Sequence, residues 1–523
     1  MKNFFYYLAA VLLATSCTGS LFETPGGYSG PSSVPHEMIV LGSRLDDPYT
    51  VENMTKALGS LYPTKSDRVV VEATPLYMRF LPADDGEFDE LVDAGLELLD
   101  HPVDYEVIRE GDYYHDPEIP EDQITWQYAV VEKDAAYPKH IRHEILDECH
   151  IPATDGSTKA DGIDWSEVER EAFRLTGNEG LLSSGNTKAR ESGTPQGRIT
   201  IVDDKTGEGP VGVRGVKVSC NSFVKFAHDY TDDEGYYKMN KNFNSRPRYR
   251  IVFKNKCGFA IGFNLLFQPA SASTLGQKSP KGADLRISSS SERKLFTRSV
   301  VNNAAYEYFK SCRNDDENMR TPPSNLRIWL FQNLDVSSAV MLQQGALIDD
   351  SVISDFLGEY TFLLKLFLPD LTIGLRGADD YAEVYSRTIH ELAHASHFMQ
   401  VGKGYWNEYI KYVITSFVTS GFITYGTGSE EGAGYCEIGE MWAYYLQSKF
   451  YRERYGDPET AFGTEYWFYP QILLYLDDRG LNKYRIFAAL TSDINSREML
   501  KKKLVSMYPE FKSAIIQAFG RYN

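Results

Sequence analysis

Residues 379–399 constrain the fold of this chain more than any other stretch. They carry His390, Glu391 and His394 in the pattern H-E-x-x-H, within a run whose apolar residues recur at helical spacing. On a helix, positions i and i+4 lie on one face, so both imidazoles can point at a single ion. One of the two aspartates that open the run can cap the helix. The stretch therefore predicts a buried helix that offers two metal ligands.

Glu391 stands between the two histidines in the sequence, where a carboxylate can take a proton from a water bound to the metal. The competing explanation is a chance meeting of these residue types on a core helix. The chain has only 10 histidines among 523 residues, so chance produces this pattern rarely. We therefore expect a Zn²⁺ site of the kind found in hydrolases, with Glu391 as the catalytic base.

A zinc site of this kind needs a third protein ligand. Within residues 285–523 the only histidine outside the motif is His397, one turn beyond it. A straight helix cannot wrap all three histidines tetrahedrally around one ion, so His397 is interpreted as a packing residue or as support for the ligands. Residues 430–446 predict a second helix, and its Glu437 and Glu440 are both candidates for the third ligand.

The segment Gly439-Glu440-Met441-Trp442-Ala443 resembles the Asn-Glu-x-Phe-Ala segment of gluzincins, the metallopeptidases that combine H-E-x-x-H with a downstream glutamate. The resemblance implies that Glu440 is the third zinc ligand, beside His390 and His394. It also implies that residues 403–429 form a helix and a loop over the cleft. A solvated acidic face is the alternative role for both glutamates of this helix.

Two positions depart from that family. Gly439 replaces the asparagine, and Tyr444 stands where thermolysin-like enzymes carry an aspartate that orients a ligand. The group that stabilises the oxyanion is also open, because the domain has no further histidine for that role. The tyrosines eligible for it are Tyr425, Tyr435, Tyr444 and Tyr445.

Residues 285–523 as a whole predict a mostly helical domain with a small sheet. A helix is expected over 293–309, and strands over 326–331 and 371–375. In zincin-type peptidases an edge strand lies just before the motif helix and pairs with the substrate. By that resemblance, the backbone from Thr372 to Leu375 is expected to hold a peptide by β-augmentation.

The start of the chain predicts export. Lys2 precedes an apolar run that is too short to span a bilayer. The run ends in Leu13-Ala14-Thr15-Ser16-Cys17, which resembles the lipobox of bacterial lipoproteins. The resemblance implies a signal peptide over 1–17, a lipid on Cys17 and a protein anchored to a membrane of the bacterial cell envelope. A plain secretory signal with an incidental cysteine is the alternative. Residues 18–35, rich in Gly, Ser and Pro, predict a flexible tether.

The rest of the chain predicts three further parts of a multidomain α+β protein. Strand patterns over 69–73 and 76–81 and a helical pattern over 86–98 predict a small α+β domain within 36–138, to which no activity can be assigned. Residues 139–195 are polar and predict a connector with one short helix, centred on 163–173.

Residues 196–268 predict a small β-sandwich, with strands at 197–201, 216–220 and 249–253. Together with Thr231-Asp-Asp-Glu-Gly-Tyr-Tyr237, this order resembles carboxypeptidase regulatory-like (transthyretin-like) domains. In that family the segment forms a turn and the start of a strand, with the glycine at positive φ and a tyrosine packed inward. Such domains are accessory modules, so no catalytic residue is expected here. Cys220 and Cys257 are the expected pair if this unit holds a disulfide.

The formal net charge of −19 argues against nucleic acid as a partner. The function expected from the sequence is therefore a lipid-anchored zinc peptidase acting on a peptide or protein. The alternative is a surface lipoprotein that keeps the fold without turnover and serves in adhesion or glycan binding.

Overall fold

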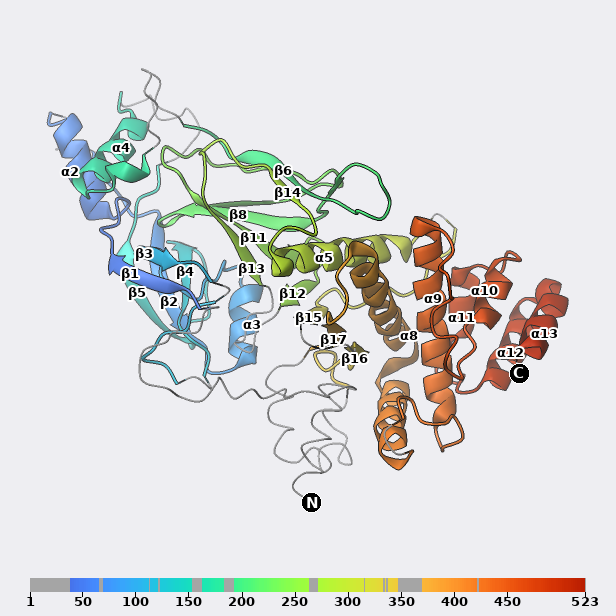
Figure 1. The fold of residues 1–523 in the computed structure, drawn as a ribbon. Helices are drawn as coiled ribbons and strands as arrows, with labels where there is room; N and C mark the ends of the chain where they lie inside the picture. Colours follow the sequence, from blue (N-terminus) through green and yellow to red (C-terminus); the bar gives the residue numbers. More distant parts are fainter. Residues whose placement is uncertain are drawn as a thin grey trace, which may run out of the picture.

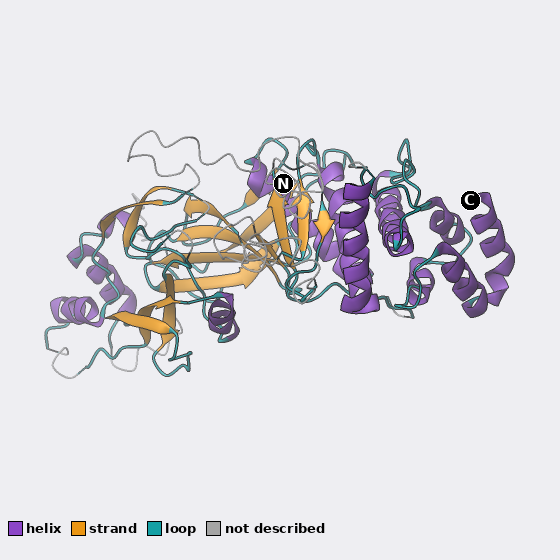
Figure 2. Ribbon diagram, turned by 90° about the horizontal axis from the view of Figure 1, so that it is seen from below, coloured by secondary structure: helices purple, strands orange, loops and turns teal. Residues whose placement is uncertain are grey.

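The computed structural model describes residues 38–522 except 65–68, 112, 121–122, 153–161, 183–191, 263–270, 315, 333, 335–336, 347–368 and 421–422. The expected signal peptide, the tether and Cys17 lie outside the described residues. The fold is mixed α+β, with the strands gathered in the N-terminal and middle parts and the helices toward the C-terminus (Figures 1 and 2). No helix among the described residues is both long and apolar enough to cross a membrane.

The N-terminal unit is built on a three-stranded antiparallel sheet with β2 (Pro75–Leu81) in the middle. Its neighbours are β4 (Gln127–Glu132) and β5 (Arg142–Glu148). The boundary expected at 138 is therefore wrong, because β5 falls in the supposed connector and yet completes this sheet. The expected strand at 76–81 is confirmed, whereas 69–73 has no strand.

The other elements of this unit form a ribbon and three helices. The ribbon pairs β1 with β3, and α2 packs against α4, which lies in the supposed connector. Their bounds are β1 Val40–Arg44, α2 Val51–Leu61, α3 Asp85–Asp93, β3 Tyr105–Arg109, α4 Trp165–Leu175 and the 3₁₀ turn η2 Glu179–Leu181.

The middle unit and the C-terminal unit share one sheet. Its eight strands include a continuous path in the order β16-β17-β15-β12-β11-β8-β9, with β13 paired to β11. The join is a parallel pair between β12 and β15, in which Ala260 lies opposite Arg327. The bounds are β8 Val216–Ser222, β9 Lys225–Tyr230, β11 Arg248–Asn255, β12 Ala260–Gly262, β13 Ala272–Gln277, β15 Arg327–Phe331, β16 Ser338–Ala339 and β17 Leu371–Gly374.

A second sheet covers the middle unit. It contains β10-β6-β14, with β7 beside β6, and its bounds are β6 Gln196–Ile201, β7 Val211–Gly212, β10 Tyr236–Lys238 and β14 Leu285–Ile287. Apolar residues from both sheets and from the C-terminal helices form a single core. The expectation of a separate sandwich at 196–268 and a separate domain at 285–523 is therefore wrong, because one sheet and one hydrophobic core include residues of both.

The expected turn before β10 is confirmed. Gly235 has φ of +77°, and a Cβ there would lie 2.1 Å from the carbonyl oxygen of Ile199, so only glycine fits. Tyr237 is buried in the core. The expected disulfide is wrong, since Cys220 and Cys257 are both free. Cys220 lies opposite Tyr249 on β11, and the turn carrying Cys257 is too far along that strand for a bond.

The helices of the C-terminal part stack outward from the sheet. Helix α5 contacts α8, α8 packs along α9, and four shorter helices follow to the C-terminus (Figure 1). The bounds are α5 Arg293–Ser311, α8 Tyr381–Thr419, α9 Ala433–Tyr455, α10 Gln471–Asp477, α11 Lys483–Ala489, α12 Arg497–Met507, the 3₁₀ turn η3 Pro509–Phe511 and α13 Lys512–Arg521. The helix expected at 293–309 is thereby confirmed.

At the end of the sheet nearest these helices, the outermost described strand is β16 and not β17. Strand β17 has the expected position, but β15 pairs with it on one side and β16 on the other. The edge from Thr372 to Leu375, which was expected to hold a peptide, is therefore already paired at Thr372. Strand β16, antiparallel to β17, is the edge strand at this end of the described sheet.

Candidate metal centre

The motif helix α8 begins where the sequence predicts. Asp380 caps it and forms a capping box with Glu383. From this start, the spacing of the motif places His390, Glu391 and His394 on the inner side of the helix, where all three are at least 93% buried. The tertiary structure thus keeps the motif away from bulk solvent.

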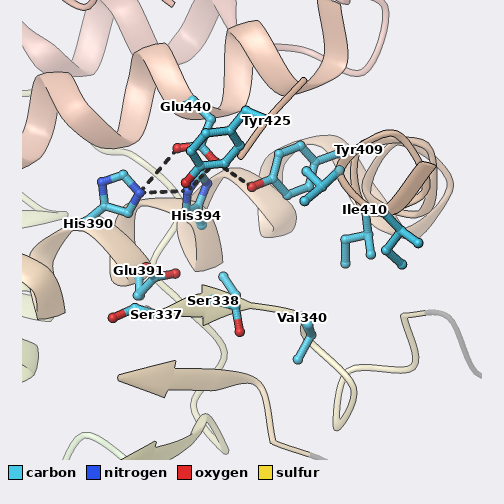
Figure 3. A pocket seen from close by; sticks show the side chains of 13 residues that line it. Ser337, Ser338, Val340, His390, Glu391, His394, Tyr409, Ile410, Tyr425 and Glu440 are labelled. Atoms are coloured by element: carbon cyan, nitrogen blue, oxygen red, sulfur yellow. Dashed lines mark hydrogen bonds and ion pairs between the residues drawn. The ribbon is translucent and has the colours of Figure 1, made fainter. Parts of the chain in front are cut away.

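Helix α9 brings Glu440 to the two histidines. Its Oε2 lies 3.4 Å from His390 Nε2, and its Oε1 lies 3.5 Å from His394 Nε2. The two Nε2 atoms are 3.2 Å apart. One potential metal-ligand atom from each of the three residues lies within 4.8 Å of the other two (Figure 3). This buried group of two imidazoles and one carboxylate could hold a metal ion.

Glu437, the other candidate ligand, is engaged elsewhere. It lies one turn before Glu440 on α9, and its Oε1 accepts a bond from Arg497 Nε at 2.7 Å. It is not a member of the buried group. Burial raises the pKa of Glu437, although the neighbouring Arg497 opposes that effect. The structure therefore chooses Glu440 between the two glutamates of this helix.

Tyr409 supports the carboxylate of Glu440. Its hydroxyl donates a hydrogen bond of 2.7 Å to Glu440 Oε1. Burial alone raises the pKa of Glu440, but the neighbouring imidazoles of His394 and His390 outweigh burial and hold that pKa well below its usual range. Glu440 therefore stays ionised in the buried group, the state in which a carboxylate can bind a metal ion.

Gln447 orients His390. Its Oε1 lies 3.1 Å from His390 Nδ1. An amide oxygen only accepts, so Nδ1 carries the proton and the lone pair of Nε2 is left to face Glu440 and His394. Gln447 lies two turns after Glu440 on the same side of α9. It supplies the orienting contact that Tyr444 does not, because the Tyr444 ring packs edge-on against His390 at a centroid distance of 4.4 Å.

Gly439 lies beside Tyr409. A Cβ at Gly439 would be in ordinary van der Waals contact with the Tyr409 ring, at 3.6 Å. His397 lies behind this contact, fully buried between the rings of Tyr405 and Trp406, and is not part of the metal group. The interpretation of His397 as a packing residue agrees with this position.

A cavity of about 60 Å³ opens in front of the buried group. Glu391 lines it, and its Oε2 has no hydrogen-bond partner within the described part of the chain. Burial raises the pKa of Glu391 to about 8. Ser337, Ser338 and Val340, in and beside the edge strand, line the cavity on the side away from Glu440 and Tyr425 (Figure 3). The residues that line the cavity are Ser337, Ser338, Ala339, Val340, His390, Glu391, His394, Tyr409, Ile410, Val413, Ile414, Tyr425 and Glu440.

Tyr425 is the one of the four candidate tyrosines that lines this cavity. Its φ of +63° is uncommon for a bulky residue, so the surrounding contacts hold it there. Tyr412 donates to the Tyr425 carbonyl at 3.0 Å, and the Tyr425 ring packs on Tyr466 and Phe468. The aromatic run that begins at Tyr466 therefore backs the site.

The second half of α8 forms the outer wall of the cavity. Gly402, with φ of +80° and ψ of 172°, kinks the helix between the candidate ligands His390 and His394 and Tyr409. The expected helix and loop between the motif and α9 are thus present. Sequence reasoning missed Tyr409 and Gln447; for Gln447, the same-face spacing from Glu440 is the signal that could have found it.

Comparison of the chain with models of known protein families, with curated proteins and with solved structures finds no match. The function is therefore argued from the geometry of the site alone.

Proposed function

We propose that this protein is a lipid-anchored, zinc-dependent peptidase. The observation that carries the proposal is the convergence of His390, His394 and Glu440 at one buried point, with Glu391 in the same cavity. Two imidazole nitrogens and one carboxylate oxygen are the protein ligands of catalytic zinc sites that keep a fourth position open. When bound, zinc lowers the pKa of a coordinated water and polarises a carbonyl group.

The chain's own atoms support a cation at this point. The two Nε2 atoms face each other at 3.2 Å, and Glu440 Oε2 is buried without a hydrogen bond. Buried polar atoms in that condition cost free energy unless something satisfies them. Imidazole and carboxylate suit zinc, and the absence of a thiolate from the group argues against ions that favour soft ligands.

Glu391 is the base in the proposed reaction. Glu391 lines the cavity and its Oε2 has no hydrogen-bond partner in the described part of the chain, so it can accept a proton from the attacking water and pass it to the leaving nitrogen. A cation nearby favours the ionised form of this carboxyl, which burial alone disfavours. The Tyr425 hydroxyl donates a hydrogen bond to the carbonyl oxygen of the substrate as negative charge develops on that oxygen.

The edge strand β16 positions the substrate. Because β16 pairs with Leu371 and Thr372 of β17, the outermost described strand next to Glu391 is β16, whose Ala339 carbonyl accepts a hydrogen bond of 3.0 Å from Trp406 Nε1. An extended peptide can add to that edge, with its scissile carbonyl directed into the cavity. Val340, Ile410 and Val413 then offer apolar contacts to a substrate side chain. An extended amide substrate is the class that this geometry suits best.

Metal content and turnover together test the proposal. The protein lacking residues 1–17 is expected to contain one equivalent of zinc and to cleave an unfolded protein such as casein. Glu440→Gln should lose the metal, whereas the neighbouring Glu437→Gln should keep it, because Glu437 binds Arg497. Glu391→Gln should keep the metal and lose turnover by roughly 10²-fold or more.

Three results separate the alternatives. Zinc without cleavage in the wild type would favour an inactive binding protein. If the wild type takes up no metal on dialysis against zinc, the peptidase proposal fails. Anchoring is tested separately: Cys17→Ser should move the full-length protein from the detergent-extracted membrane fraction to the soluble fraction, without changing its zinc content.

A further inference from the structure

A second cavity lies far along the chain from the metal centre, between the β1–β3 ribbon and the β11–β13 pair. Its volume is about 90 Å³, and it shares no lining residue with the first cavity. The residues that line it are Ile39, Leu98, Leu99, Asp100, His101, Val107, Glu110, Gly111, Arg248, Arg250, Val252, Ala272 and Thr274. Apolar side chains and polar or charged side chains are thus equally numerous in its wall.

Arg250 is the unusual member of this lining. Alternate residues of β11 face opposite sides of the sheet, so Tyr249 and Ile251 enter the core while Arg250 faces the ribbon. Its side chain is 94% buried. Its Nη2 donates to Asn221 Oδ1, but its Nε has no partner, and no carboxylate forms an ion pair with it in the part of the chain that the structure describes.

The acidic groups nearest to Arg250 are committed to other partners. Asp100 binds His101 Nδ1 at 2.7 Å and the backbone N–H of Tyr114 at 2.6 Å. Glu97 binds the Ser219 hydroxyl at 2.8 Å and also pairs with Lys217 and His228.

Glu110 pairs with Arg248. The guanidinium of Arg250 is therefore buried without a direct ion pair, although Glu97 and Asp100 attract it through space and the Phe226 ring centroid lies 5.8 Å from its Cζ. Such a charge is costly, and burial accordingly lowers the pKa of Arg250.

We propose that the Arg250 cavity binds a small monocarboxylate that carries a short apolar chain. The guanidinium receives the carboxylate, and the hydroxyl of Thr274, which lies opposite Arg250 on β13, is placed to donate a second bond. Thr274 Oγ1 already accepts from the N–H of Gly276, so its proton is available. Leu98, Leu99 and Val252 receive the apolar chain.

Charge and size select this class of ligand. With one guanidinium to receive the ligand, the cavity favours a single negative charge, and the charge of Asp100 in the same wall disfavours a dianion such as phosphate more strongly than a monoanion. A cavity of about 90 Å³ holds more than one water and admits only a small molecule, and butyrate is of that class.

A larger cleft of about 550 Å³ adjoins the cavity, because the two share Val107, Glu110 and Arg248. This cleft gives a ligand a route to Arg250 past the Arg248–Glu110 ion pair.

Calorimetric titration of the protein lacking residues 1–17 tests the proposal, with butyrate as the probe. Butan-1-ol, butylamine and inorganic phosphate are the matched ligands. Butyrate should bind at one saturable site, and the other three should not compete with it. Arg250→Gln should weaken butyrate binding by about tenfold or more, since a charge-assisted hydrogen bond is lost.

A second variant guards against a folding defect in the first. Ala272→Leu keeps the guanidinium but fills the cavity wall next to Val252, and it should also abolish binding. Far-UV circular dichroism checks the fold of each variant. The proposal is overturned if butyrate binds no better than butan-1-ol, if phosphate displaces it, or if a folded Arg250→Gln or Ala272→Leu variant binds it as the wild type does. Zinc content and cleavage do not enter this test, so it stands or falls independently of the peptidase proposal.

Discussion

The hydroxyl of Tyr409 donates a hydrogen bond of 2.7 Å to Oε1 of Glu440, although the two residues lie on different helices. The bond links the kinked half of α8 to the carboxylate that completes the buried group. It fixes the orientation of Glu440 while leaving Oε2 turned toward His390. Groups that orient ligands in this way affect metal affinity nearly as strongly as some ligands do.

Tyr409→Phe is therefore expected to weaken zinc binding by about 10- to 100-fold without unfolding the protein. Competition with a chromogenic chelator measures the affinity. Tyr405→Phe is the matched control, because it also removes a hydroxyl from α8, one that donates to the carbonyl of Ile494 rather than to a ligand. Equal affinities for the two variants would contradict the role given to Tyr409.

Tyr425→Phe tests the assignment of the oxyanion donor. Loss of one such donor costs about 10²- to 10³-fold in kcat, and KM and zinc content should change little. Tyr435→Phe is the control, since Tyr435 packs on Tyr405 and does not line the cavity. Steady-state kinetics on a fluorogenic peptide measure both constants. A fall in zinc content that parallels the fall in kcat would instead make Tyr425 a structural residue.

Gly402→Ala tests the kink in α8. Nothing lies within 4 Å of the added Cβ, so the cost comes from the backbone, whose φ of +80° disfavours any side chain. We expect a loss of about 1–3 kcal/mol in the free energy of unfolding and reduced turnover, because the following half-helix carries Tyr409. Gly404→Ala has equal space and no positive φ, and should be neutral or slightly stabilising. Urea unfolding compares the two.

Asp47 predicts a pH dependence of stability away from the metal centre. Burial raises its pKa to about 8, whereas the unfolded chain has a value of about 3.9. Between these values the folded protein holds a proton that the unfolded chain has released. Its contribution to the free energy of unfolding is therefore largest below about pH 4 and is lost as the pH rises to about 8, by up to about 1.4 kcal/mol per pH unit.

Asp47→Asn removes this titration. The free energy of unfolding of the variant, relative to the wild type, should therefore increase from pH 5 to pH 8. Urea unfolding of both proteins at each pH measures the difference, which cancels the contribution of other groups. Asp93→Asn, at an exposed position, is the matched control substitution. A difference that stays constant with pH would show that Asp47 is ionised throughout.

Local pattern was sufficient to predict much of this protein. The capped helix with His390, Glu391 and His394 on one side follows from the 3.6-residue period and from Asp380, both of which act over a few residues. The turn at Gly235 follows from the same kind of local constraint. Individual helices and strands of the middle and C-terminal parts were predicted for this reason, and so was the short list of candidate ligands.

Only the tertiary structure decided how these pieces meet. Glu440 rather than Glu437 belongs to the metal group because α9 packs on α8 with that side inward. A short strand that was not predicted, β16, pairs with Leu371 and Thr372 of β17, so the proposal places the substrate at β16 rather than at β17. Tyr409, Tyr425 and the buried charge of Arg250 likewise depend on contacts between residues distant in the sequence. Residue spacing determines which side chains share a face of a helix or strand. Long-range packing determines which other element each face contacts, and the candidate metal centre consists of such contacts.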